Sequence, residues 1–370
     1  MLQNVIGIEL GRKDGDTLGL GCIEQVRARM VENNALTMAL VGCGNIARAH
    51  WRGMRAHAPR IRVTAVVDSD PDNAASMSER TGAVAYSSLS EALAKGSFDA
   101  VDLMLPHDLH EEAAVQAFAA GKHVLLEKPM AIDLAACERI MVAANAAKTV
   151  FMIAEQAQYW TDIKRARDLI NEGLIGKVVM ARACFYDPLP TRTTKEDGVP
   201  WRFNLARAGG GICIDGGAHW IRPLRMLLGE VSEVIASMGS HIAKMEGESW
   251  AQALIRFDSG VTASFHALLG GGTMAPTEDF RITGTTGEIV IEHGRDGRLI
   301  LFNDEDPEGV SIMDAFQGKV DSYGLELEDF ASAVLDSKTL EASAEYSLGE
   351  LRTALAMYRS VESRNWERVW

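Results

Sequence analysis

The sequence predicts an α/β protein of two domains: an amino-terminal doubly wound parallel sheet, then an α+β domain with a large, mostly antiparallel, open sheet. Short apolar runs alternate with helical patterns up to about residue 154, as in parallel strands joined by crossover helices. Beyond that point the apolar runs lengthen and follow one another through turns such as DSG and GTTG, which is typical of antiparallel strands. The length of 370 residues suits two domains.

The first domain is expected over residues 36–154. It opens with the apolar run LTMALV, which stops at Gly42, and a helical pattern over 45–57 precedes the second run, IRVTAVV, which reaches Asp68. These three elements form one βαβ unit. The further elements expected here are, in chain order, a helix over 88–94, a strand over 100–105, a helix over 109–120 that ends at Gly121, a strand over 123–126, a helix over 133–147 and a strand over 149–154.

The second domain is expected over residues 155–345 and should bind the substrate. Residues 346–370 should form a C-terminal helix that packs back on the first domain, whereas residues 1–35 are an extension to which we assign no role. The elements predicted after residue 155 are helices over 162–171, 322–335 and 348–363, and strands over 177–185, 231–240, 250–257, 261–268, 279–283 and 288–292.

The composition restricts the class of protein. A hydrophobic fraction of 47% and a charged fraction of 24% are close to the average of soluble globular proteins. The net charge of -14 argues against nucleic acid or an anionic membrane surface as a partner, because both favour basic patches, and leaves a small molecule. The pattern lacks a signal peptide and any apolar run long enough to span a bilayer, so a cytoplasmic protein is predicted. No CxxC pair occurs among the five cysteines Cys22, Cys43, Cys137, Cys184 and Cys213, so neither a disulfide framework nor a zinc site is indicated.

A glycine turn of the dinucleotide-binding type follows the first strand. Residues 42–47 read GCGNIA, a GxGxxA pattern placed between a strand and a helix, as the fingerprint requires. Gly42 permits the tight turn, and Gly44 lets the backbone approach a pyrophosphate. The phosphates would sit on the free N–H groups at the helix start, which includes Asn45 and Ile46. This pattern predicts a Rossmann domain.

Asp68 supports the same conclusion and indicates which dinucleotide binds. It ends the second strand near the offset of the acid that accepts hydrogen bonds from the adenosine ribose. A carboxylate there would repel a 2′-phosphate, and Asp70 and Asp72 add to the repulsion. The predicted cofactor is therefore NAD and not NADP.

Two further motifs carry groups suited to chemistry on a hydroxyl or carbonyl. Glu127 and Lys128 follow an apolar strand, and so lie at the carboxyl edge of the sheet, where open α/β folds bind ligands. The second motif is GGGICIDGGAH, in which Asp215 and His219 would share one face of a helix if a helix covers both. Histidine is well suited to accept a hydroxyl proton near neutral pH. A glycine-rich helix start with a capping aspartate and a core histidine is an equally open interpretation.

The ordered segments VGCGNIA, PHDLHEEAAVQAFAAGKHVLLEKP, LINEGLIGKV and GGGICIDGGAH resemble the glucose-fructose oxidoreductase and inositol dehydrogenase family, called Gfo/Idh/MocA, over residues 36–365. The resemblance implies that Lys128, Asp215 and His219 form the catalytic group, which also contacts the substrate. It implies a homodimer or homotetramer through the second sheet, and a cis peptide bond before the proline of the EKP motif. The residues that it places at the cofactor, beyond the glycine turn and Asp68, are Pro106, His107, His110, Glu127 and Lys128.

The sequence departs from the family pattern after the histidine. Where relatives carry an acid, HWIRPLR has Arg222 and then Pro223, which should kink or restart a helix. Arg222 or Arg225 is expected either to hold a substrate acid or aromatic ring, or to pair with surface carboxylates. Tyr159 and Trp160 fit either the core or a pocket.

Two other features suggest ligand contacts. Residues 187–203 look like a long loop of the kind that covers active sites, and Trp201 and Arg202 within it are candidate substrate contacts. His107 and His110 could be read as metal ligands, but no acid or cysteine cluster supports them, so no metal is predicted.

The sequence thus predicts an NAD-dependent oxidoreductase that oxidises a ring secondary hydroxyl of a sugar, glycoside or cyclitol. The long loop and the HWIRPLR segment favour a glycoside, oxidised at C3 of a glucose ring. Two alternatives stay open: an NAD-dependent glycosidase that oxidises, eliminates and re-reduces, and a non-catalytic dinucleotide sensor. The lysine, acid and histidine together argue against the sensor.

Overall fold

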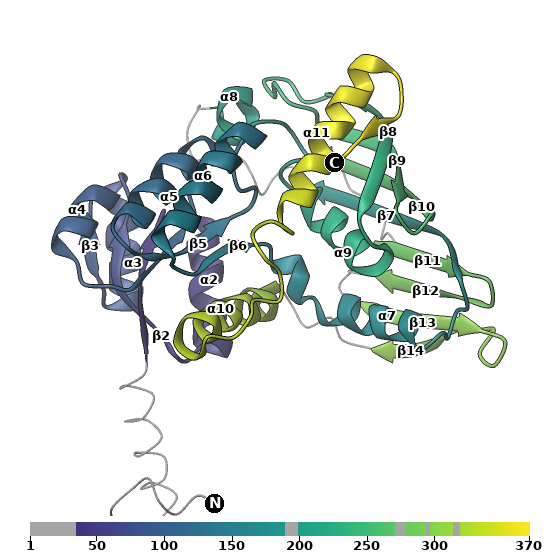
Figure 1. Ribbon diagram of the computed structural model, residues 1–370, viewed down its shortest axis with the longest axis horizontal. Helices are drawn as coiled ribbons and strands as arrows, with labels where there is room; N and C mark the ends of the chain where they lie inside the picture. Colours follow the sequence, from purple (N-terminus) through teal and green to yellow (C-terminus); the bar gives the residue numbers. More distant parts are fainter. Residues whose placement is uncertain (1–34, 189–198, 271–278, 293–296, 314–318) are drawn as a thin grey trace, which may run out of the picture. The chain divides into compact units, whose positions relative to one another are not determined.

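The computed structural model describes residues 35–188, 199–270, 279–292, 297–313 and 319–370 (Figure 1). The predicted N-terminal extension, except its last residue, and the middle of the predicted loop over 187–203 lie outside these ranges. The two predicted sheets are both present, so the fold class is confirmed.

The first sheet has six parallel strands in the order β3-β2-β1-β4-β5-β6. The order reverses between β1 and β4, which is the place where doubly wound sheets bind ligands. The strands are β1 (Leu36–Val41), β2 (Ile61–Val67), β3 (Val84–Tyr86), β4 (Ala100–Leu103), β5 (His123–Glu127) and β6 (Phe151–Ala154). The helices that connect them are α2 (Asn45–His57), α3 (Pro71–Thr81), α4 (Leu89–Lys95), α5 (His110–Ala119) and α6 (Leu134–Ala147).

Helix α3 and strand β3 were not predicted from the sequence. The helix is mostly polar and buries only two apolar side chains, and the strand is a three-residue edge strand with little buried surface. A hydrophobic pattern is therefore weak in both. The capping chemistry of α3 is nevertheless regular: the Asp70 carboxylate accepts hydrogen bonds from the first turn, and the helix ends at Gly82 with a left-handed φ of 73°.

The second sheet has nine strands in the order β14-β13-β12-β11-β7-β10-β9-β8-β15. Every pair in it is antiparallel except β7 with β10. The last three strands in the chain were not predicted; β14 is largely exposed, and β15 has only two residues. The strands are β7 (Val178–Pro188), β8 (Val231–Gly239), β9 (Trp250–Phe257), β10 (Thr262–Gly270), β11 (Phe280–Gly284), β12 (Gly287–Glu292), β13 (Arg298–Asn303), β14 (Val310–Met313) and β15 (Glu367–Arg368).

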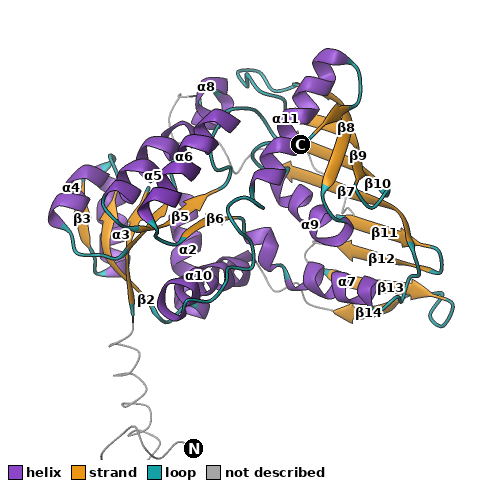
Figure 2. Ribbon diagram, in the orientation of Figure 1, coloured by secondary structure: helices purple, strands orange, loops and turns teal. Residues whose placement is uncertain are grey.

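Helices cover one face of this sheet and leave the other open (Figure 2). Buried and exposed residues alternate along β9 and β10, as expected for a sheet with one solvated face. The helices and short 3-10 turns after β6 are η2 (Gln156–Tyr159), α7 (Thr161–Asn171), η4 (Trp201–Phe203), α8 (Leu205–Ala208), α9 (Ala218–Leu228), α10 (Lys319–Asp336) and α11 (Leu348–Ser363).

The C-terminal helix has its main contacts within the second domain. Helix α11 packs on β8 and α9 of the second sheet, whereas α10 lies along α2 of the first domain (Figure 1). Glycines allow the close contact of α10 with α2. A Cβ on Gly53 of α2 would lie 2.7 Å from the backbone nitrogen of Gly324 in α10, so only glycine permits the two helices to approach this closely.

Two local expectations about residues 215–225 also need correction. Asp215 does not lie in a helix with His219, because a run of turns covers residues 212–217 and α9 begins at Ala218. Pro223 does not break the helix either: α9 continues through it to Leu228.

Candidate functional site

The glycine turn and Asp68 form a cradle for a dinucleotide. Gly42 has a φ of +89°, and a Cβ there would lie 2.3 Å from the Met104 carbonyl oxygen, so the position requires glycine. Nothing lies within 4 Å of a Cβ built on Gly44, so the backbone there is open to a ligand. Asp68 is held against the turn, because its carboxylate accepts hydrogen bonds from the backbone N–H groups of Cys43 (2.7 Å) and Asp70 (2.8 Å).

The start of α2 fits phosphate groups. No side chain caps the helix, and its first turn contains no acid, so backbone N–H groups remain available to an anion. Asn45 is exposed and Ile46 half-buried. The turn, the start of α2 and Asp68 thus offer hydrogen-bond donors suited to a pyrophosphate and an acceptor suited to a ribose.

Lys128 and Asp215 meet at the carboxyl edge of the first sheet. The Lys128 ammonium donates hydrogen bonds to the backbone carbonyl of Asp215 (2.6 Å) and to its carboxylate (3.1 Å). The other carboxylate oxygen of Asp215 accepts a hydrogen bond from Nε of Arg202 at 3.0 Å. Asp215 thus lies between two cations, and the Lys128–Pro129 peptide bond is cis, as the resemblance implied.

The imidazole of His219 is held by Glu155, which sequence reasoning missed. Nδ1 of His219 lies 2.6 Å from a carboxylate oxygen of Glu155, which is almost fully buried. Burial opposes the charge of Glu155, but His219, Arg222 and Lys128 outweigh it and lower the pKa of Glu155 to about 2. Its position directly after β6 was a usable signal, because it is the same sheet edge that pointed to Lys128.

The loop after β4 lies beside this group. Pro106 is half-buried, and His107 is buried with Nδ1 2.8 Å from the Ala208 carbonyl oxygen. Burial lowers the pKa of His107 to about 3, so the ring is neutral. His110 is fully buried, and its two ring nitrogens lie 2.9 Å from the carbonyl oxygens of Leu105 and Pro129. Burial lowers the pKa of His110, so its neutral ring donates a hydrogen bond to one of the two and supports the loop from beneath.

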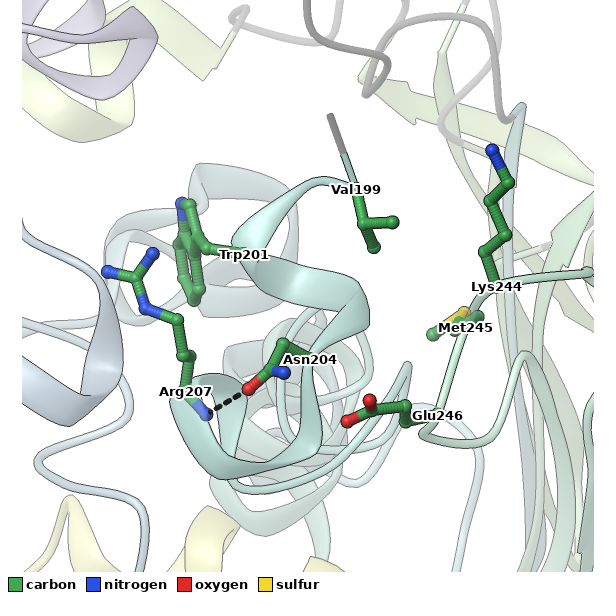
Figure 3. A pocket seen from close by; sticks show the side chains of 7 residues that line it. All are labelled: Val199, Trp201, Asn204, Arg207, Lys244, Met245 and Glu246. Atoms are coloured by element: carbon green, nitrogen blue, oxygen red, sulfur yellow. Dashed lines mark hydrogen bonds between the residues drawn. The ribbon is translucent and has the colours of Figure 1, made fainter. Parts of the chain in front are cut away.

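Trp201 and Arg202 connect the catalytic candidates to an outer pocket. The Arg202 guanidinium lies over the Trp201 ring at 4.3 Å, and this ring meets His107 edge to face at 4.8 Å. On its outer side Trp201 lines a pocket of about 510 Å³, with Lys244 on the opposite wall (Figure 3). The remaining lining residues are Val199, Asn204, Arg207, Met245 and Glu246.

Of the two roles expected for Arg222 and Arg225, the structure shows pairing with carboxylates, although Glu350 is buried and does not lie at the surface. Arg222 is fully buried, and its guanidinium donates to both carboxylate oxygens of Glu350 at 2.7 and 2.9 Å. Arg225 is buried as well and bonds Glu350 and Glu230. Both arginines therefore join α9 to its neighbours.

The side chains of Tyr159 and Trp160, each 2% exposed, belong to the core. In the described part of the chain, no three histidine, cysteine or acidic side chains gather as a metal site would require. No described helix combines the length and apolar character needed to cross a membrane.

Comparisons with known proteins agree with this geometry. Residues 36–155 match the oxidoreductase family with an NAD-binding Rossmann fold, and residues 163–290 match the GFO/IDH/MocA C-terminal domain. The 1,5-anhydro-D-fructose reductase of Ensifer adhaerens is 27% identical over 331 residues, which cover 87% of this chain and 95% of the relative.

A second relative and a solved structure extend the comparison. The dTDP-3,4-didehydro-2,6-dideoxy-alpha-D-glucose 3-reductase of Actinomadura kijaniata is 30% identical over 260 residues, 69% of this chain and 74% of the relative. The structure of levoglucosan dehydrogenase in complex with NADH superimposes with a TM-score of 0.81 at 22% identity, over 91% of this chain and 99% of that one. The chain is therefore a member of the Gfo/Idh/MocA family, and it is an NAD-binding oxidoreductase.

Proposed function

We propose that the protein oxidises a ring secondary hydroxyl of a sugar, glycoside or cyclitol, with Lys128, Asp215 and His219 as the catalytic group. The observation that carries the proposal is the convergence of an ammonium and an imidazole, each held by its own carboxylate, at the edge of the sheet beside a dinucleotide cradle. A secondary alcohol needs these two groups: one base for its proton, and one donor for the charge that develops on its oxygen.

Bound NAD supplies the hydride acceptor. Gly42, Gly44, Asn45 and Ile46 would hold its pyrophosphate, and Asp68 would accept hydrogen bonds from its ribose hydroxyls. Pro106, His107, Glu127 and Lys128 would lie near its nicotinamide. His110 would act only by supporting the loop that carries Pro106 and His107.

The protein side chains divide the proton chemistry between them. Glu155 accepts the hydrogen bond from Nδ1–H of His219, which leaves Nε2 as the nitrogen that takes the hydroxyl proton. Lys128 donates a hydrogen bond to the same substrate oxygen and stabilises its developing negative charge. Asp215 keeps the ammonium in place until substrate arrives, and it can then accept a hydrogen bond from a neighbouring hydroxyl. The reverse reaction, ketone reduction, uses the same groups.

Within this substrate class we favour a glycoside oxidised at C3. Arg202 bonds Asp215 of the catalytic group and lies over Trp201, and Trp201 lines the pocket of about 510 Å³, where a second ring or aglycone has room to stack. The similarity to a sugar 3-reductase and to the levoglucosan dehydrogenase structure supports a sugar ring. The glycosidase and sensor alternatives find no such support in these names.

The open face of the second sheet supports a homodimer or homotetramer. Met180 of β7 is 53% exposed and Leu254 of β9 is 46% exposed, and the strand register places both side chains on the face that helices leave uncovered. Light scattering should give a dimeric or tetrameric mass that falls to the monomer for Leu254→Asp. Val142→Asp, on an exposed position of α6, should leave the mass unchanged.

The proposed activity is tested by following NADH formation with a panel of sugars, aryl glycosides and inositols. Lys128→Ala and His219→Ala should each lower kcat by about 100-fold or more. Lys122→Ala serves as a control, because its ammonium bonds the Phe98 carbonyl oxygen away from the site. Release of free sugar without net NADH would instead indicate the glycosidase, and equal kcat for all variants would refute the dehydrogenase assignment.

A further inference from the structure

A buried group of charged side chains lies directly behind Lys128. His50 of α2 is fully buried between two carboxylates: Nδ1 lies 2.8 Å from Oδ2 of Asp102 in β4, and Nε2 lies 3.1 Å from Oε1 of Glu127. Burying charges is costly, and a buried ion pair is weak evidence for stability. The arrangement therefore calls for a functional explanation.

The geometry defines the charge of His50. A neutral imidazole has one N–H group, whereas both ring nitrogens of His50 face carboxylate oxygens, so only the imidazolium can donate to both. Burial opposes this charge, but Asp102 and Glu127 outweigh it and raise the pKa of His50 well above its ordinary value.

Helix α10 of the second domain adds two side chains to this buried group. The Tyr323 ring lies 5.2 Å from the His50 ring, and a carboxylate oxygen of Glu326 lies 4.0 Å from Nε2 of His50. Neither oxygen of Glu326 has a hydrogen-bond partner among the described residues, and burial raises the pKa of this carboxyl well above its ordinary value.

Glu127 joins this group to the catalytic lysine. Its second oxygen, Oε2, accepts a hydrogen bond from the backbone N–H of Lys128 at 3.1 Å. The carbonyl oxygen of Pro129, the residue after Lys128, lies 2.9 Å from Nδ1 of His110. The turn that presents Lys128 is thus held on both sides by buried histidines.

We propose that His50 is a positioning residue for Lys128: it holds the Glu127 carboxylate inward, so that the lysine is left to Asp215 and the substrate. If His50 releases Glu127, this carboxylate becomes a second partner for the Lys128 ammonium and draws it from the substrate oxygen. This role of His50 rests on the function proposed above. It means that Glu127 helps to position Lys128, in addition to its expected contact with the cofactor.

The two ring nitrogens permit a matched pair of variants. His50→Gln places an N–H donor near the position of Nε2 and keeps the bond to Glu127, whereas His50→Asn places its donor near Nδ1 and keeps only the bond to Asp102. We expect kcat within about 5-fold of the parent for His50→Gln and about 20- to 100-fold lower for His50→Asn, with NADH affinity within about 3-fold for both. Equal kcat for the two variants would overturn the proposal.

His57→Asn is the matched control. His57 lies on the same helix and bonds Asp321 of α10. The variant therefore measures the effect of a weaker contact between α2 and α10, while the hydrogen bond from His50 to Glu127 is kept. Its kcat should equal that of the parent even if its melting temperature falls. A loss of kcat equal to that of His50→Asn would assign the effect to helix packing and reject the positioning role.

A spectroscopic measurement keeps the test open if a variant fails to fold. In the parent protein labelled with ¹⁵N at histidine, one ring should show two protonated nitrogens at pH 8, and no pH change from 6 to 9 should alter it. A neutral ring at every buried histidine would contradict the proposal. If the parent gives no NADH with any substrate, the proposed function fails, while this measurement still decides the state of His50.

Discussion

Nδ1 of His219 lies 2.6 Å from Oε1 of Glu155, a carboxylate buried at the end of β6. This contact sets which nitrogen of the imidazole faces a substrate. It also places the catalytic candidates of two domains on one sheet edge, since Lys128 follows β5 and Glu155 follows β6.

Glu155→Gln should lower kcat by about 100-fold, because the amide cannot stabilise the imidazolium that forms when His219 takes a proton. NADH affinity, measured by fluorescence titration, should change little. Glu138→Gln, at an exposed position of α6, is the control and should keep the kcat of the parent. Parent-like turnover of Glu155→Gln would show that His219 needs no carboxylate partner.

The same carboxylate should contribute to the pH dependence of stability. The pKa of Glu155 falls from 4.5 to about 2 on folding, so its contribution is complete above pH 4.5 and is lost as the pH falls through 2. The difference in unfolding free energy between the parent and Glu155→Gln should therefore shrink as the pH falls below about 4.5. Urea denaturation of both proteins across this pH range measures the difference in unfolding free energy. A difference that grows on acidification would contradict the lowered pKa of Glu155.

Asp68→Ala should weaken NAD binding by about 10- to 100-fold, because charge-assisted hydrogen bonds to the ribose are lost. NADP binding should tighten once the carboxylate no longer repels a 2′-phosphate. Asp72→Ala removes an exposed acid nearby and should leave the preference for NAD almost intact. Comparable turnover of the parent with NADP would refute the role given to Asp68.

Gly42→Ala should destabilise the first domain by roughly 3 kcal/mol or more, because the new Cβ meets both a strained φ and the Met104 carbonyl oxygen. Gly82→Ala has a similar φ, +73°, but open space around the Cβ, so it should cost only about 1–2 kcal/mol. Urea denaturation of the two variants separates the close contact from the backbone strain. Equal losses would mean that the turn can shift away from Met104.

Arg222→Met should lower the unfolding free energy by about 3–5 kcal/mol, because it leaves the buried Glu350 without its bidentate partner. Adding Glu350→Leu should recover part of the loss. Arg165→Met breaks an exposed pair with Glu172 at 3.0 Å and should cost less than about 1 kcal/mol. A small loss for Arg222→Met would mean that water replaces the guanidinium at Glu350.

The first domain was predictable because its signals are local. The run LTMALV, the GxGxxA turn and the helix over 45–57 each depend on neighbours within a few residues, and the structure has β1 and α2 at these places. Weakly amphipathic or very short elements, such as α3 and β15, carry too few apolar positions for a pattern to appear.

Periodicity and short motifs were enough to predict the two sheets, the dinucleotide turn, and Lys128, Asp215 and His219 as candidate site residues. Three contacts became visible only in the folded chain: Glu155 holds His219, Arg222 faces Glu350, and α10 and not α11 covers α2. The physical reason is the same in each case. These contacts join side chains or helices that are distant in the chain, and which partner they meet depends on close packing that no local pattern records.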